Sequence, residues 1–264
     1  SVMIGNPMTI PHLMLSFTDR EHMQKEDLAA IKRSGISFRG KGNWPSLEEI
    51  VPGYVPVYPD RDSLVELLLV LQQVYIVLEK AKKDASFLQL DSAAVPAFLV
   101  RIPTGNGPGF RWKEHLLELD PRWAETSYLV DVSSYSRKAL AGLPEASQVL
   151  HIELFMLPAP VKEKGNRAYF PFILLMVDSY TGMVISNSVL APQPDMRSMC
   201  ESIPQKVVDE LLKLGHRPSE IGIRTGLLFE LLDELLELAG CTVNLVEEMP
   251  EMDEAIASFI SHLS

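Results

Sequence analysis

The pattern of apolar and polar positions changes near residues 143–147 of the chain. After this point, apolar runs of strand length alternate with segments of helical periodicity, and turn residues separate them. The pattern predicts the order β-β-β-α-β-α-β-α, with strands at 149–157, 169–178, 183–190, 220–224 and 241–246 and helices at 195–214, 227–239 and 251–263. Three antiparallel strands followed by crossover units indicate an α/β domain, in which helices flank a mixed sheet.

The first half of the chain is less regular, and we expect an α+β domain there. Strands are expected at 8–17, 97–102 and 128–132, helices at 19–34 and about 64–83, and a helical turn at 113–119. The sequence therefore predicts two domains, residues 1–147 and 148–264.

Two segments of this half raise particular expectations. Residues 38–62 are rich in proline and glycine, which predicts an irregular, largely extended loop. The helix after this loop, with Asp62 or Ser63 as its cap, is apolar enough to suggest a buried core helix. Its apolar stretch, 64–80, is too short and too often interrupted by polar residues to span a membrane.

Composition indicates a globular protein, with 47% hydrophobic and 22% charged residues. The net charge is -11, and residues 151–264 carry most of it, with 8 Lys or Arg against 17 Asp or Glu. Broad binding to a phosphate backbone needs an excess of Lys and Arg, so this half disfavours it.

The cysteines and the start of the chain bear on its location. Cys200 and Cys241 form neither a disulfide framework nor a zinc-binding spacing, which favours a reducing, cytoplasmic compartment. Residues 1–12 do not have the pattern of a signal peptide, and no membrane partner is expected. The chain does not begin with Met, so further residues could precede it.

The expected element order of the second half, together with the runs 173–190 and 211–246, resembles the ribonuclease H-like fold, which includes integrases and transposases. The run 173-ILLMVDSYTGMVISNSVL-190 is similar to the hairpin between the second and third strands of integrase cores. The run 211-LLKLGHRPSEIGIRTGLLFELLDELLELAGCTVNLV-246 is similar to their helix, strand, turn, helix and strand. The resemblance covers about 100 residues and implies that a metal site should be sought here.

That resemblance implies an eroded metal site. It places the first catalytic acid near Glu153 and the second at Thr225–Gly226, where no acid is present. Two-metal catalysis needs several carboxylates around the ions, so we predict no catalytic residues, no metal and no cofactor. The alternative is a nuclease or phosphotransferase dependent on Mg or Mn, in which Glu153, Asp178 and either Asp209 or Glu201 converge.

Asp178 also has a simpler interpretation. It lies at the start of the hairpin turn, where an Asp side chain accepts backbone N–H groups and Gly182 supplies a left-handed conformation. We favour this structural role. His151 lies two residues from Glu153 on a strand, so their side chains share one face of the sheet.

A second resemblance spans nearly the whole chain. The strings 25-KEDLAAIKRSGISFRG-40 and 38-FRGKGNWPSLEEIVPGYVPVYPDRD-62 resemble a bacterial two-domain family of uncharacterised proteins, in which an FRG…WP…PGY-P segment precedes a long helix. The strings 214-LGHRPSEIGIRT-225 and 248-EMPEMDEAIASF-259 resemble the same family. The resemblance implies two domains and no assigned activity.

The candidate binding residues lie in two loops. Arg39 and Lys41 flank glycines beside Trp44, which suggests an anion contact with an aromatic stacking face, or a loop that Trp44 anchors to the core. Arg111 and Trp112 follow the glycine-rich run 105-GNGPG-109, where a mobile surface loop is the alternative. Acidic residues on one face of the helix at 227–239 are expected to be a solvated surface.

The sequence therefore leaves the substrate and the function open. The favoured hypothesis is a non-catalytic, degenerate ribonuclease H-like protein that binds a protein or a nucleic acid. The alternatives are the metal-dependent enzyme and a protein–protein adaptor that uses the Trp44 loop.

Overall fold

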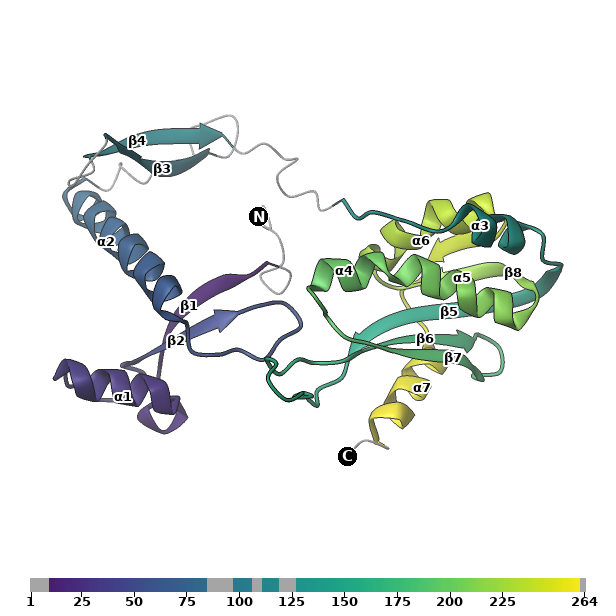
Figure 1. Ribbon diagram of the computed structural model, residues 1–264, viewed down its shortest axis with the longest axis horizontal. Coiled ribbons are helices and arrows are strands. Elements are labelled where there is room, and N and C mark those ends of the chain that lie inside the picture. Colours follow the sequence, from purple (N-terminus) through teal and green to yellow (C-terminus); the bar gives the residue numbers. More distant parts are fainter. Residues whose placement is uncertain (1–9, 85–96, 106–110, 119–126, 262–264) are drawn as a thin grey trace. The chain divides into compact units, whose positions relative to one another are not determined.

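The computed structural model describes residues 10–84, 97–105, 111–118 and 127–261 (Figure 1). The chain forms two compact units. The N-terminal unit contains Pro11–Ile50 and Pro56–Thr126, and the C-terminal unit contains Val51–Val55 and Ser127–Ser264. The predicted boundary at 147/148 falls inside a strand of the C-terminal unit, so the structure places the division earlier, before Ser127.

The N-terminal unit begins with an antiparallel strand pair, β1 (His12–Thr18) and β2 (Trp44–Ile50). A short 3-10 helix, η1 (Arg20–His22), and helix α1 (Lys25–Ser34) connect them. Helix α1 ends at Gly35, whose φ of 69° is the left-handed conformation that commonly closes a helix.

Strand β2 corrects the expectation of an irregular loop at 38–62. It forms because β1 supplies a pairing partner, with Leu47 opposite Leu15 and Pro45 opposite Phe17. Proline cannot donate a ladder hydrogen bond, and it is tolerated here because the sheet has two strands and every strand is an edge. The sequence did not predict this strand, because residues 38–62 are rich in proline and glycine.

Helix α2 (Arg61–Lys83) is longer than expected and begins earlier. Its N-cap is Asp60, which accepts a hydrogen bond from the backbone N–H of Ser63 at 2.8 Å, and neither Asp62 nor Ser63 caps it. The expectation that this helix is buried is wrong, because none of its residues is buried among the described parts of the chain.

A second antiparallel hairpin, β3 (Ala97–Thr104) and β4 (Arg111–Glu118), completes the N-terminal unit. Strand β4 replaces the helical turn expected at 113–119, because its residues pair with β3 along their whole length. Glu114 on β4 forms ion pairs with Arg101 on β3 and with Lys80 on α2, which join the hairpin to the helix. Figure 1 shows α2 running between the two strand pairs.

The C-terminal unit is a mixed α/β domain built on a five-stranded sheet, as the apolar pattern predicts. Its elements are α3 (Ser134–Ala141), β5 (Glu145–Met156), β6 (Phe172–Asp178), β7 (Val184–Leu190), α4 (Met196–Glu201), α5 (Ile203–Leu214), β8 (Arg217–Ile223), α6 (Gly226–Leu238), β9 (Thr242–Leu245) and α7 (Pro250–Ser261). The strand order is β7-β6-β5-β8-β9. Strand β6 is antiparallel to β5 and β7, whereas β8 is parallel to β5 and β9. The strand expected at 128–132 does not form, and α3 was not expected.

The sheet of the C-terminal unit separates two apolar layers. One layer packs Leu150, Ile152 and Met176 against helices α3 to α6. The other packs Ile173, Leu175 and Val177 against α7. Helix α7 lies on the opposite side of the sheet from the other helices (Figure 1). Because side chains alternate between faces along a strand, each residue of β5 and β6 can be assigned to one layer or the other.

The described helices include none that combines the length and the apolar character needed to cross a lipid bilayer.

Candidate functional site

Glu153 occupies the position on β5 where the resemblance to integrases implies the first catalytic acid. The residue is buried, and its Oε2 accepts a hydrogen bond from Nε of Arg224 at 3.0 Å. The same guanidinium donates to Asp253 Oδ1 on α7 at 2.8 Å. These two carboxylates, led by Asp253, raise the pKa of Arg224 above its usual value. The negative charge of Glu153 is therefore compensated by an arginine of the same chain.

Asp178 is held in the β6–β7 turn. Its carboxylate accepts hydrogen bonds from Nε2 of Gln148 at 2.8 Å, from the N–H of Tyr180 at 3.1 Å, and from both the N–H and the Oγ1 of Thr181 at 2.9 Å. Gly182 has the left-handed φ of 68° that the turn needs. The Gln148 contact and then the Thr181 backbone contact lower the pKa of Asp178 from 3.8 to about 2. The contacts are those of a turn residue.

The three carboxylates of the alternative catalytic set do not converge. Glu153 lies opposite Leu175, in the layer that packs against α7, whereas Asp178 lies opposite Leu150, on the other face. Asp209 is exposed on α5 and accepts a hydrogen bond from Gln205 of its own helix at 2.7 Å. A two-metal site needs its acids around ions about 4 Å apart, and this arrangement does not provide it.

Thr225 stands where the resemblance implies a second acid. It is the N-cap of α6, and its Oγ1 accepts a hydrogen bond from the N–H of Leu228 at 3.5 Å. The threonine therefore has a structural role at the end of β8, since hydroxyl side chains are among the preferred N-caps.

His151 lies beside Glu153 on the α7 face of β5, as the two-residue spacing predicts. It is buried, and its Nδ1 has no hydrogen-bond partner among the described residues. Its ring lies against Gly222, where a Cβ atom would come within 2.7 Å of His151 Cδ2. Burial lowers the pKa of His151 below the usual 6.5, Glu251 opposes this shift and Arg224 adds to it. His151 is thus neutral near physiological pH.

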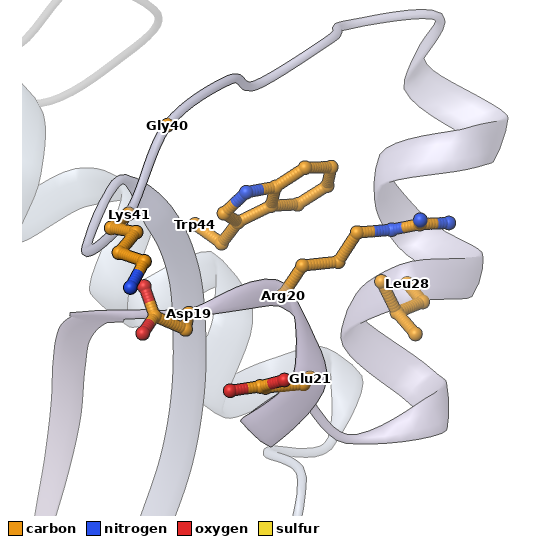
Figure 2. A pocket seen from close by; sticks show the side chains of 7 residues that line it. All are labelled: Asp19, Arg20, Glu21, Leu28, Gly40, Lys41 and Trp44. Carbon is orange, nitrogen blue, oxygen red and sulfur yellow. The ribbon is translucent and has the colours of Figure 1, made fainter.

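A hollow of about 440 Å³ lies in the N-terminal unit around Trp44, the first residue of β2. Figure 2 shows the residues that line it, which are Asp19, Arg20, Glu21, Leu28, Gly40, Lys41 and Trp44. The Arg20 guanidinium lies 5.5 Å from the centre of the Trp44 ring, and Phe38 lies 6.1 Å from it at a tilt of 51°. Lys41 points towards the carboxylate of Asp19 (Figure 2). The hollow thus combines one aromatic ring with two cations and two anions.

Of the five predicted binding residues, two line this hollow and three do not. Lys41 and Trp44 line the hollow, whereas Arg39 is exposed on the same loop and does not line it. Arg111 and Trp112 lie on β4, opposite Thr104 and Pro103, and are not among the residues that line this hollow. The glycine-rich run before them is described only at Gly105.

The sequence reasoning missed Arg20, Asp19 and Glu21, which come from η1 and the residue before it. Asp19, Glu21 and His22 also form, among the described residues, a group whose ligand atoms lie within 4.8 Å of one another and could hold a metal ion. One Asp19 oxygen already accepts the N–H of Gly42 at 2.7 Å, which fixes the loop to η1. The acid-rich string 19-DREH-22 was the available signal, but it becomes part of the hollow only through the fold.

Comparison with known families covers most of both units. Residues 136–260 match a model described as a domain of unknown function (DUF6930), and residues 6–101 match a second domain of unknown function (DUF7309). The chain is a two-domain protein of unknown function. The predicted resemblance to a two-domain family of this kind is confirmed. No curated protein matches the chain.

Among solved structures, the chain is similar to the catalytic core domain of BIV integrase, at 10% sequence identity and a TM-score of 0.30. The similarity covers 44% of this chain and 66% of the integrase chain, which is less than two thirds of that protein's length.

Proposed function

We propose that the protein is a non-catalytic binding protein, whose C-terminal unit is a ribonuclease H-like domain without a functional metal site. The observation that carries this proposal is the ion pair between Glu153 and Arg224. A carboxylate that binds Mg or Mn must face the ion, and Glu153 instead faces a guanidinium at 3.0 Å. A metal ion at Glu153 would have to displace the Arg224 guanidinium, which is also held by an ion pair with Asp253.

The N-terminal hollow is the proposed binding site, with a protein as the partner. Arg20 and Lys41 are balanced by Asp19 and Glu21, so the hollow offers no net positive charge to a phosphate backbone. Arg20 lies over the Trp44 ring, which reduces the surface available for stacking a nucleobase. Protein interfaces are enriched in tryptophan and arginine at their centre and have a polar rim, and Trp44 and Arg20 with the charged residues around them fit that composition.

The absence of metal chemistry is tested by titrating Mg²⁺ or Mn²⁺ while following thermal unfolding. We expect no rise in midpoint that depends on Glu153, because a ligand stabilises a protein only in proportion to its binding to the folded state. A rise that vanishes in Glu153→Gln would contradict the proposal. A His22→Gln variant is the matched control, since a rise that vanishes there comes from the group on η1 and leaves the C-terminal conclusion intact.

The binding role is tested with Trp44→Ala in affinity capture from cell extract, followed by identification of what is retained. We expect loss of a specific protein partner in Trp44→Ala and retention in Tyr180→Ala, which truncates an exposed aromatic residue in the other unit. Both variants are first compared with the wild type by circular dichroism. Capture of nucleic acid in place of protein, or equal capture by both variants, would overturn the assignment.

A further inference from the structure

Strand β7 forms an edge of the sheet in the C-terminal unit, and no other described strand pairs with its outer side (Figure 1). Its seven residues, VISNSVL, include no charged residue and no proline. Proteins usually protect an exposed sheet edge with such residues, because the unpaired N–H and C=O groups of an edge can bind another strand. The edge of β7 lacks this protection along most of its length.

The side of β7 that faces the α7 layer is also exposed. Val184 and Val189 lie opposite Val177 and Ile173 of β6, whose side chains pack against α7. Val184 is nevertheless 44% exposed and Val189 is 67% exposed. Helix α7 therefore covers β6 and leaves this side of β7 open.

A hollow of about 580 Å³ lies between the start of β7 and α7. Its volume is within the range of about 300–1,000 Å³ that is usual for binding pockets. One wall is formed by the β6–β7 turn and Val184, and the other by Glu251, Glu254, Ala255, Ser258 and Phe259 of α7. These α7 residues recur at spacings of three and four, so the hollow follows one face of the helix for about 12 Å. Because Val184 belongs to both, the hollow and the exposed edge are continuous.

The charged side chains of the hollow are both acidic. Glu251 and Glu254 line it, and no Lys, Arg or His does so among the described residues. Neither glutamate forms an ion pair with any residue that the structure describes. Apolar surface of Val184, Ala255 and Phe259 lies beside the two carboxylates. This combination suits a Lys or Arg side chain, whose methylene groups cover apolar surface while its charged end binds a carboxylate.

A second copy of the chain does not supply such a cation through the same edge. Residues 179–196, which contain β7 and the segments on both sides of it, include no Lys or Arg. Two β7 edges paired with each other would therefore leave both hollows without a basic side chain. The charge of the hollow favours a strand from a different protein, one that carries a Lys or Arg.

We propose that β7 and the hollow beside α7 form a docking surface for an extended, basic segment of a partner protein. The segment adds a strand to the outer edge of β7, and one of its Lys or Arg side chains enters the hollow and binds Glu251 and Glu254. Backbone hydrogen bonds along the edge supply affinity, whereas the hollow selects the side chain. The ring of Phe259 packs on that of Phe155 at 6.3 Å, which fixes this wall to the apolar layer. The surface lies in the C-terminal unit and is independent of the Trp44 hollow.

The first test offers the intact chain to immobilised peptides long enough to pair with the seven residues of β7. The central residue of each peptide is Lys, Arg, Gln or Glu, and the flanking positions are mixtures of Val, Ile, Thr and Ser. We expect retention on the Lys and Arg peptides to exceed that on the Gln peptides by about tenfold, because the hollow is acidic. Equal retention whatever the central residue, or retention on none of the peptides, would overturn the proposal.

The second test asks whether the peptide binds as a strand. The best-retained peptide is methylated on alternate backbone nitrogens, in two complementary versions that have the same charge. Only every second N–H of an added strand points towards β7, so one version should bind about tenfold more weakly and the other should bind like the unmethylated peptide. Fluorescence anisotropy of a labelled peptide measures both affinities. Equal affinities of the two versions would show that the segment does not extend the sheet.

The third test fills the hollow from the chain itself. Val184→Lys places a cation beside Glu251 and Glu254 and should abolish the retention of Lys and Arg peptides. Tyr180→Lys is the matched control, because it adds the same charge to an exposed residue of the adjacent turn that does not line the hollow. Equal retention by the two variants would contradict the proposal.

A milder change covers the case in which Val184→Lys loses its native circular dichroism. Glu254→Gln removes one carboxylate from the hollow and should weaken peptide binding by about fivefold to tenfold. Glu237→Gln removes an exposed acid from α6 and should leave the affinity unchanged. If these two variants bind the peptide alike, the acidic hollow is not the binding site.

The mass of the intact chain, measured by light scattering, distinguishes a partner protein from a second copy. We expect Val184→Lys to have the same mass as the wild type, because the proposed occupant is a different protein. A wild-type dimer that dissociates in Val184→Lys would show that a second copy occupies the edge of β7, and it would overturn the proposed partner.

Discussion

The two units of the chain bury different kinds of residue. In the C-terminal unit, both faces of the sheet carry apolar layers, and most of β6 is fully excluded from solvent. In the N-terminal unit, Met23 is the one buried hydrophobic residue of the core set, among the residues described. The same unit also buries the hydrogen-bonded polar pair Asp27 and Ser46. One unit is held by an apolar core, whereas the other depends on a polar link and leaves its most apolar helix exposed.

The described residues of the C-terminal unit therefore enclose an apolar core, whereas those of the N-terminal unit bury little apolar surface. Burying apolar area is the main source of folding stability, and a unit that buries little of it is marginal on its own. All three tryptophans lie in the N-terminal half, so tryptophan emission follows that unit, whereas circular dichroism follows both.

The largest effect is expected from the apolar core. Leu150→Ala should lower the free energy of unfolding of the C-terminal unit by about 2–5 kcal/mol, because Leu150 is fully buried between β6 and β8 and leaves a cavity. The change should appear in denaturation followed by circular dichroism and not in tryptophan emission. Phe17→Ala, on the exposed side of β1, should cost no more than about 0.5 kcal/mol. Equal losses in the two variants would contradict the contrast between the units.

The next effect concerns the charge that the C-terminal unit buries. Arg224→Ala should cost about 2–3 kcal/mol, because it leaves the buried carboxylate of Glu153 without its cation. Adding Glu153→Gln in the same chain should recover part of the loss, since the uncompensated charge is then removed. Urea denaturation of the single and double variants measures this coupling. Additive losses would show that the two groups do not interact.

The corresponding effect in the N-terminal unit comes from its polar link. Asp27→Ala should cost about 1–3 kcal/mol, because Ser46 Oγ and the N–H of Leu47 both donate to this carboxylate, at 2.9 and 3.2 Å. The loss should be seen in tryptophan emission. Glu26→Ala removes an exposed acid from the same turn and is the control. If the two variants unfold alike, Asp27 does not link α1 to β2.

The sequence predicted the C-terminal unit well because its apolar periodicities coincide with actual burial. The runs around β6 and α6 are apolar where the structure is buried, and their limits differ from the expected ones by a few residues. The N-terminal unit was harder because its strands depend on partners distant in the chain. Strand β2 contains Pro45, and β4 becomes a strand by pairing with β3 rather than by its own pattern.

In the candidate site too, the contacts between residues close in sequence were predictable, and the contacts between distant residues were not. The turn role of Asp178 is local, and its contacts with Thr181 follow from residue types that are close in sequence. The separation of Glu153 from Asp178 depends on the register of β5 against β6, which no local pattern specifies. The ion pair with Arg224 and the approach of Arg20 to Trp44 also require the tertiary fold. The exposure of α2 could not be anticipated, because its apolar pattern is equally consistent with a buried helix.

The smallest effect concerns pH and again separates the two units. Because the folded pKa of Asp178 is lowered to about 2, its hydrogen bonds stabilise the C-terminal unit fully above pH 3.8, and this contribution is lost as the pH falls from 3.8 to about 2. Asp178→Asn should cost about 1–2 kcal/mol at neutral pH and should flatten the pH dependence in that window, because the amide does not titrate. Circular dichroism at a series of pH values measures both. Tryptophan emission should show no difference between Asp178→Asn and wild type, and an equal change there would mean that the two units unfold together rather than separately.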